Sequence, residues 1–181
     1  MNLANKLTIL RIFLIPIFMI FLLNRIPYGV EIAAFVFILA AITDALDGYV
    51  ARKKNQVTTL GKFMDPLADK LLVSAALISL VQMGKISALV AVIIIAREFT
   101  ISVLRSVAAA EGIVIAASWW GKLKTITQII AIIAILIDNF PFKYINVPFD
   151  TIMIWIAVIL TIISGVDYIV INKHVLKHEE I

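Results

Sequence analysis

Four aspartates lie in one stretch of the chain, in a sequence that is otherwise strongly apolar. Asp44 and Asp47 are three residues apart and Asp65 and Asp69 are four apart, so on a helix each pair projects from one face. Two such helices facing one another would bring four carboxylates together. Carboxylate oxygens are the ligands that Mg²⁺ and Mn²⁺ prefer, and these ions commonly share their coordination shell with substrate phosphates. The spacing therefore predicts metal-assisted transfer of a phosphoryl-type group.

Small residues accompany the aspartates on the same helical faces. Gly48 and Ala51 follow Asp44 by four and seven residues, and Gly61 precedes Asp65 by four. Small side chains let a ligand or a neighbouring backbone approach closely. The arrangement therefore predicts room for a substrate beside the carboxylates.

The stretch matches the pattern D-x2-D-G-x2-A-R-x8-G-x3-D-x3-D at every fixed position. In this pattern the chain resembles the CDP-alcohol phosphotransferase family, and eight specified residues at fixed spacing are far more specific than a lone glycine motif. The segments NKLTILR, DPLADKLL, IIAREFTISVLR and GKLKT are similar to one branch of that family, the bacterial phosphatidylglycerolphosphate synthases, so the resemblance covers most of the chain. The matching residues are Asp44, Asp47, Gly48, Ala51, Arg52, Gly61, Asp65 and Asp69.

The resemblance implies a reaction and the roles of the residues. A phosphatidyl group would pass from CDP-diacylglycerol to glycerol 3-phosphate, giving phosphatidylglycerol phosphate and CMP. Asp44, Asp47 and Asp65 would hold two divalent ions, Mg²⁺ or Mn²⁺, while Asp69 would border the metal cluster as a further ligand and act as general base for the attacking hydroxyl. Residues that would bind the CDP part of the donor are Asp44, Asp47, Gly48, Ala51, Arg52 and Gly61.

The amphipathic start of the first apolar segment offers further polar residues. Asn5, Thr8 and Arg11 are expected to line the mouth of the site, and Asn5 and Thr8 are expected to contact the donor. The alternative is that they cap the helix and anchor it at the membrane surface.

Composition indicates an integral membrane protein. The chain has 181 residues, 62% of them hydrophobic, and a mean hydropathy of +1.06, which is too apolar for an ordinary soluble domain. We expect one all-α domain over residues 1–181, a bundle of six transmembrane helices. These helices are expected near residues 7–23, 30–50, 61–83, 86–109, 119–137 and 149–170, with a loop over residues 138–150.

The second and third helices must contain the aspartates. The charge-free stretches at residues 32–43 and 71–83 are shorter than the roughly 20 residues needed to cross a membrane. The helices therefore continue through Asp44 and Asp47 and begin before Asp65. Pro66 indicates either a first-turn position or a local kink.

Positive charge predicts the orientation of the bundle. Twelve of the sixteen Lys and Arg residues fall on one side of this topology, three fall on the other, and Arg97 is embedded in a span. The bias predicts a multi-pass protein of the cytoplasmic membrane with both termini and the polar active site at the cytoplasmic face. The twelve are Lys6, Arg11, Arg52, Lys53, Lys54, Lys62, Lys70, Arg105, Lys122, Lys124, Lys173 and Lys177, and the three are Arg25, Lys85 and Lys143.

Four of the cations are candidates for binding an anionic acceptor. Arg97, Arg105, Lys122 and Lys124 lie on the fourth and fifth expected helices, towards the side that carries the aspartates. Arginine forks and lysine point charges suit the phosphate of glycerol 3-phosphate. In the alternative, Arg97 or Arg105 pairs with Glu98 and the lysines are membrane-surface anchors.

Other functions remain open at this level. A sister enzyme would use inositol phosphate, serine or phosphatidylglycerol as acceptor. A cation transporter or a prenyltransferase would also use aspartates, but neither needs the spacing of Gly48, Ala51, Arg52 and Gly61. The net charge of +4 is spread over short loops, so we expect no nucleic-acid partner. We expect a homodimer.

Overall fold

The computed structural model describes residues 3–24, 26–54, 59–110, 112–113, 115 and 118–172 of the chain, and it describes their side chains except at positions 3–6, 44–54, 59–63 and 65. Over these ranges the chain forms six α-helices and one short 3₁₀ helix, with no β-strand. The expectation of an all-α fold with six helices is confirmed for this part of the chain. The elements are α1 (Leu3–Leu23), α2 (Gly29–Lys54), α3 (Thr59–Gln82), α4 (Ala88–Ala110), α5 (Trp119–Leu136), η1 (Phe142–Ile145) and α6 (Phe149–Ile171).

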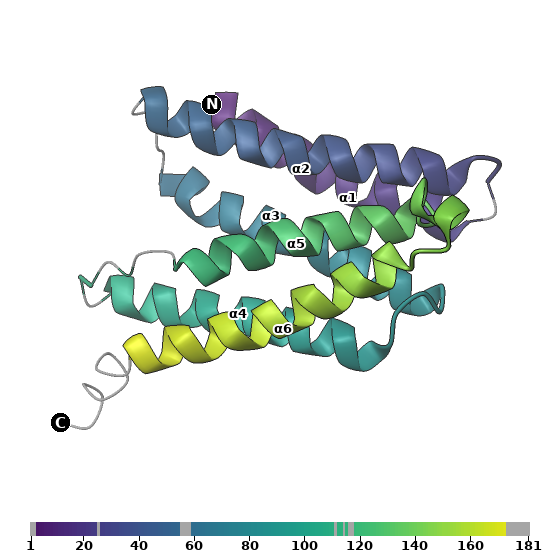
Figure 1. Cartoon of the computed structure of the whole chain (residues 1–181). Coiled ribbons are helices and arrows are strands. Elements are labelled where there is room, and N and C mark those ends of the chain that lie inside the picture. Colours follow the sequence, from purple (N-terminus) through teal and green to yellow (C-terminus); the bar gives the residue numbers. More distant parts are fainter. Residues whose placement is uncertain are drawn as a thin grey trace.

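Consecutive helices run in opposite directions along the bundle (Figure 1). We call the end where α2 finishes and α3 begins the aspartate end. The start of α1, the end of α4, the start of α5 and the end of α6 lie at this same end. The far end holds the turns that connect α1 to α2, α3 to α4 and α5 to α6.

A hydrophobic core runs along the middle of the bundle. Helix α1 packs against α2 and α3, and α6 packs against α4 and α5. Phe18 and Phe37 are fully buried with their ring centroids 5.8 Å apart, and Leu77, Leu80 and Ile132 are also fully buried. Against lipid tails, which are as apolar as these side chains, such burial stabilises the bundle mainly through close van der Waals packing.

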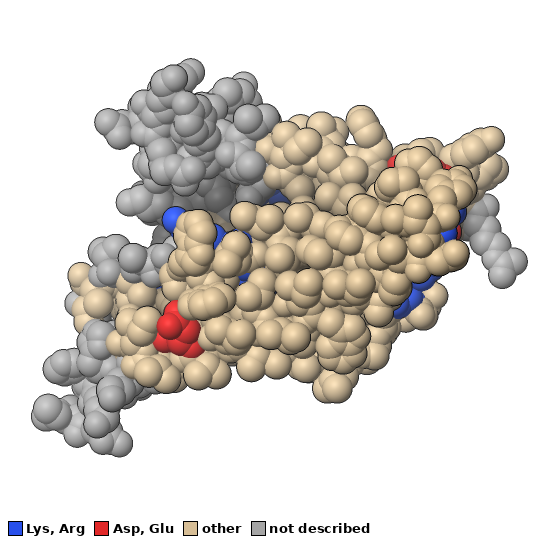
Figure 2. All heavy atoms as spheres, viewed as in Figure 1, with Lys and Arg blue, Asp and Glu red and all other residues tan. Residues whose placement is uncertain are grey.

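The outer surface of the helices is apolar as well. Phe13, Phe35, Leu89 and Ile159 are each more than half exposed. In Figure 2 the middle of the visible face carries neither basic nor acidic side chains, and the coloured charges gather towards its two ends. By length and composition, α5 and α6 can each cross a membrane. An apolar surface of this extent is typical of a protein that contacts lipid.

The helix boundaries confirm where the aspartates lie along the chain. Helix α2 continues past Asp44 and Asp47 to Lys54, and α3 begins at Thr59, ahead of Asp65 and Asp69. Pro66 lies well inside α3, so the first-turn alternative for this proline is wrong. The segment at residues 138–150 forms a connection, as expected, although it also contains η1.

Candidate active site

The motif residues lie on the last turns of α2 and the first half of α3. The backbone of these turns belongs to the aspartate end of the bundle (Figure 1). Convergence of the four carboxylates stays a prediction, because most of these side chains lie outside the described ones. The predicted site residues whose side chains are not described are Asn5, Asp44, Asp47, Gly48, Ala51, Arg52, Gly61 and Asp65.

Asp69 is the motif aspartate whose surroundings are described. Its side chain is partly buried, and the neighbouring Ala68 is completely buried. The Asp69 carboxylate interacts electrostatically with Glu98 on α4, with Lys124 on α5 and with Arg11 on α1. Asp69 therefore belongs to a polar cluster formed by four helices, inside the bundle.

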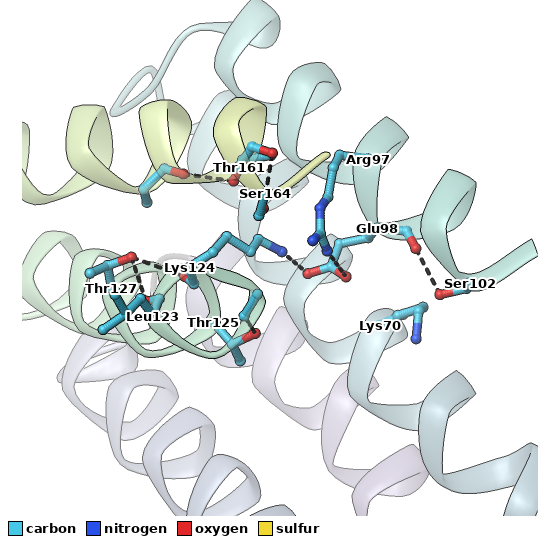
Figure 3. A network of polar contacts seen from close by, with 12 residues as sticks. Lys70, Arg97, Glu98, Ser102, Leu123, Lys124, Thr125, Thr127, Thr161 and Ser164 are labelled. Carbon is cyan, nitrogen blue, oxygen red and sulfur yellow. Dashed lines mark hydrogen bonds and ion pairs between the residues drawn. The ribbon is translucent and has the colours of Figure 1, made fainter. Parts of the chain in front are cut away.

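Glu98 lies at the centre of this cluster. Its Oε1 accepts a hydrogen bond from Nζ of Lys124, and its Oε2 lies 3.9 Å from Nη1 of Arg97 (Figure 3). Lys124 is completely buried, while the side chain of Glu98 is 21% exposed. A buried ammonium group requires a charged partner, because an isolated buried charge is strongly unfavourable. Glu98 provides that partner, and Arg97 pairs with the same carboxylate.

Two glycines make room for Arg97. A Cβ atom at Gly165 on α6 would lie 3.3 Å from Cγ of Arg97, and one at Gly121 on α5 would lie 3.7 Å from its Nη2. The Arg97 side chain therefore extends from α4 along two neighbouring helices that carry no side chain at these points. These glycines were not predicted from the sequence, although a lone glycine inside an apolar helix often has such a packing reason.

Arg105 lies beside Tyr168 on α6. Its guanidinium carbon is 5.4 Å from the centroid of the tyrosine ring, a cation–π distance. Tyr168 is 2% exposed, and among the described residues neither its hydroxyl nor Nε of Arg97 has a hydrogen-bond partner. Buried polar groups normally have a hydrogen-bond partner. The Tyr168 hydroxyl and Nε of Arg97 are therefore donors available to a ligand or to water. Tyr168 was not predicted from the sequence, where its only signal is a phenol on a largely apolar helix.

The four predicted acceptor cations thus lie in different surroundings. Arg97 and Lys124 both pair with Glu98, whereas Arg105 lies over the ring of Tyr168. Arg105 and Lys122 are both exposed. Of the two alternatives for Glu98, its pairing with Arg97 is observed, and Lys124 is a second partner.

Thr8 and Arg11 are buried on the inner side of α1, with exposures of 1% and 0%. Helix α1 begins at Leu3, so neither residue is in a capping position. Their burial also argues against a surface anchor, and Arg11 interacts electrostatically with Asp69. That Thr8 lines the mouth of the site stays a prediction.

The shared position of Glu98 leads to a stability prediction. Glu98→Gln removes the charged partner of two cations, and we expect it to reduce the free energy of unfolding by about 3 kcal/mol. Lys124→Met should cost less, because Glu98 would keep Arg97 as its partner. The measurement is thermal or denaturant unfolding of both single variants and the double variant in detergent. Equal losses in the two single variants, with simple additivity in the double variant, would contradict the pairing.

Comparison with known proteins identifies relatives over nearly the whole chain. A model of the CDP-alcohol phosphatidyltransferase family matches residues 1–163. A protein from Bacillus subtilis named CDP-diacylglycerol–glycerol-3-phosphate 3-phosphatidyltransferase is 48% identical, and the alignment covers 97% of each chain. Proteins with the same name from Haemophilus influenzae and Rickettsia bellii are 40% and 39% identical. These two alignments cover 95% and 92% of this chain and 94% and 93% of the relatives.

Proposed function

Since the chain belongs to the CDP-alcohol phosphatidyltransferase family, we propose that it transfers a phosphatidyl group from CDP-diacylglycerol to glycerol 3-phosphate. The products are phosphatidylglycerol phosphate and CMP. The observation that carries this proposal is the complete aspartate motif, in a chain that aligns almost end to end with relatives named for this reaction. The same relatives favour glycerol 3-phosphate over the acceptors of the sister enzymes.

The chemistry of the motif side chains fits a pair of divalent ions. Asp44, Asp47 and Asp65 supply hard anionic oxygens, which suit Mg²⁺ or Mn²⁺ and not softer metals. When bound, such ions stabilise negative charge on the diphosphate and on the departing CMP. Arg52 would contact the diphosphate, and Gly48, with the other small motif residues, would leave space for the nucleotide.

Asp69 is proposed as the general base. It takes the proton from the attacking hydroxyl of glycerol 3-phosphate as the hydroxyl oxygen bonds to the phosphorus next to diacylglycerol. The bond between that phosphorus and the oxygen of CMP breaks, and CMP leaves with the bonding electron pair. Support for this role comes from the position of Asp69 inside the bundle, within electrostatic reach of Lys124 and Arg11, where an anionic acceptor can be held.

The acceptor phosphate is assigned to Arg97, Arg105, Lys122 and Lys124. Glycerol 3-phosphate carries close to two negative charges near neutral pH, so binding it away from bulk water requires several cations. Nε of Arg97 and the hydroxyl of Tyr168 support this assignment, because neither has a hydrogen-bond partner among the described residues. The ring of Tyr168 also lies against Arg105.

We further propose that the bundle spans the cytoplasmic membrane six times, with the aspartate end in the cytoplasm, and that the protein is a homodimer. Lys122 and Lys124 lie on the first turns of α5 at the aspartate end, whereas Lys85 and Lys143 lie at the far end, which supports this orientation. Arg25, Lys173 and Lys177, which contributed to the charge argument, lie outside the described residues.

Substitution of Arg105 tests the acceptor site. Arg105→Gln should raise the KM for glycerol 3-phosphate about tenfold to a hundredfold at an unchanged KM for the donor, because one charge-assisted contact is lost. Arg105→Lys should recover only part of this loss, since a point charge cannot replace a planar fork. The measurement is a pair of saturation curves, one for each substrate, on protein reconstituted in lipid.

Lys85→Gln at the far end is the matched control and should leave both KM values at the wild-type level. If substitutions at all four cations keep the wild-type KM for glycerol 3-phosphate, or weaken the binding of the donor instead, these residues are not the acceptor site. A sister enzyme with another acceptor would then be favoured.

A further inference from the structure

A cavity of about 780 Å³ lies at the far end of the bundle, between α2 and the last turns of α3 and α5. Its floor is apolar and includes the buried residues Ala34, Leu80 and Leu136. Phe35 and Phe140 also line it and are 67% and 52% exposed, so the cavity opens at the surface of the molecule. Its volume is within the range of about 300–1,000 Å³ that is typical of ligand sites.

The cavity is separate from the proposed transfer site. Leu80 on its floor and Asp69 are eleven residues apart on α3, which is about 16 Å along a helix. None of the residues that line the cavity belongs to the aspartate motif or to the acceptor cations. The proposed reaction therefore gives this cavity no role.

Charged side chains of both signs form one rim of the cavity. Asp138 bridges two lysines, with Oδ1 lying 3.2 Å from Nζ of Lys85 and Oδ2 lying 3.2 Å from Nζ of Lys143. Glu31, in the first turn of α2, lines the cavity as well. The hydrogen bonds from Lys143 and Lys85 lower the pKa of Asp138, so its carboxylate stays ionised at neutral pH. Two positive and two negative groups therefore surround an apolar floor.

The connection after α5 holds this rim in place. Asp138 and Asn139 adopt left-handed backbone conformations, with φ of 52° and 57°, which asparagine and aspartate tolerate better than most residues. The Asn139 side chain donates a hydrogen bond from Nδ2 to the carbonyl of Val147 at 2.7 Å, and its Oδ1 accepts one from the backbone N–H of Asp150 at 3.2 Å. The charged groups are therefore arranged before any ligand binds.

We propose that this cavity binds a zwitterionic membrane phospholipid, with an acyl chain on the apolar floor and the headgroup at the charged rim. The lipid phosphate would meet Lys85 and Lys143, and its ammonium group would meet Glu31 and Asp138. An anionic headgroup would gain the lysines but would offer no positive group to Glu31 and would add negative charge beside Asp138, so zwitterionic lipid is favoured. The inference depends on the proposed membrane placement of the bundle and not on the transfer reaction.

Native mass spectrometry of the full-length protein in detergent tests the proposal. The protein is titrated with phosphatidylethanolamine or phosphatidylglycerol of identical acyl chains. We expect one phosphatidylethanolamine to bind at least about fivefold more tightly than phosphatidylglycerol. The double variant Lys85→Gln/Lys143→Gln should weaken this binding about tenfold, since each exposed ion pair contributes up to about fivefold. Lys173→Gln/Lys177→Gln removes the same charge elsewhere and should have no effect.

Photo-crosslinking locates the bound lipid. A phosphatidylethanolamine with a diazirine on its acyl chain should label residues 30–38 and 135–140, and Ala34→Leu, which fills the floor, should reduce the labelling. Equal or tighter binding of phosphatidylglycerol, unchanged affinity in the Lys85/Lys143 variant, or labelling only outside these segments would overturn the proposal. Crosslinks between two copies through these segments would also overturn it, in favour of a protein interface. Release of CMP by the Lys85/Lys143 variant should stay at the wild-type rate, which separates this test from that of the transfer reaction.

Discussion

Replacement of Asp65 by asparagine should lower the rate of CMP release about a hundredfold to a thousandfold, the range for loss of one preorganised group that stabilises charge in a transition state. Asparagine keeps the size of the side chain but removes the negative charge that a divalent ion requires. The same loss is expected for Asp44→Asn and Asp47→Asn. Excess Mg²⁺ or Mn²⁺ should restore little activity, because the ligand itself is missing.

The measurement is the initial rate at saturating concentrations of both substrates over a series of metal concentrations. Asp150→Asn is a matched control, because Asp150 lies in the first turn of α6 at the far end. Its Oδ1 accepts a hydrogen bond from the Thr151 backbone N–H, which asparagine can also accept. This control should keep wild-type activity. Full activity of the Asp65→Asn protein after chelation of metal would contradict the metal-site assignment.

Replacement of Asp69 by asparagine should lower turnover by about a hundredfold to ten-thousandfold, the usual contribution of a positioned general base. Donor affinity should persist in the presence of metal, because the amide removes a proton acceptor and leaves the three other aspartates intact. The measurement combines equilibrium binding of CDP-diacylglycerol with single-turnover release of CMP. Asp69→Glu keeps the carboxylate at a shifted position and should recover part of the rate.

A different outcome would reassign Asp69. If donor affinity collapses while the bound donor still reacts at the wild-type rate, Asp69 acts as a metal or donor ligand and not as the base.

Helix extents were predictable from the sequence because membrane thickness sets a minimum length for a span. The charge-free stretch before Asp44 is too short, so α2 had to include Asp44 and Asp47, and it does. The same reasoning placed Asp65 and Asp69 within α3. It could not place Pro66, because the start of α3 mixes apolar residues such as Leu60 and Phe63 with polar and charged ones, and this mixture does not mark where the helix begins.

Side-chain partners inside the bundle were beyond what the sequence could predict. Glu98 and Lys124 are 26 residues apart on different helices, and their contact depends on how α4 and α5 are rotated about their axes. The sequence left two arginines as candidates for Glu98. In the structure Arg97 pairs with Glu98, while Arg105 lies over the ring of Tyr168. Gly165 and Gly121 leave space for the Arg97 side chain.

Release of CMP from CDP-diacylglycerol by the purified, reconstituted protein tests the proposed function most directly. Each acceptor is supplied alone, as glycerol 3-phosphate, inositol phosphate, serine or phosphatidylglycerol, with Mg²⁺ or Mn²⁺ present or removed by chelation. The proposed function predicts rapid CMP release only when glycerol 3-phosphate and a divalent ion are both present, with phosphatidylglycerol phosphate formed in equal amount. CMP release that requires a different acceptor, or that continues unchanged after chelation, would contradict it.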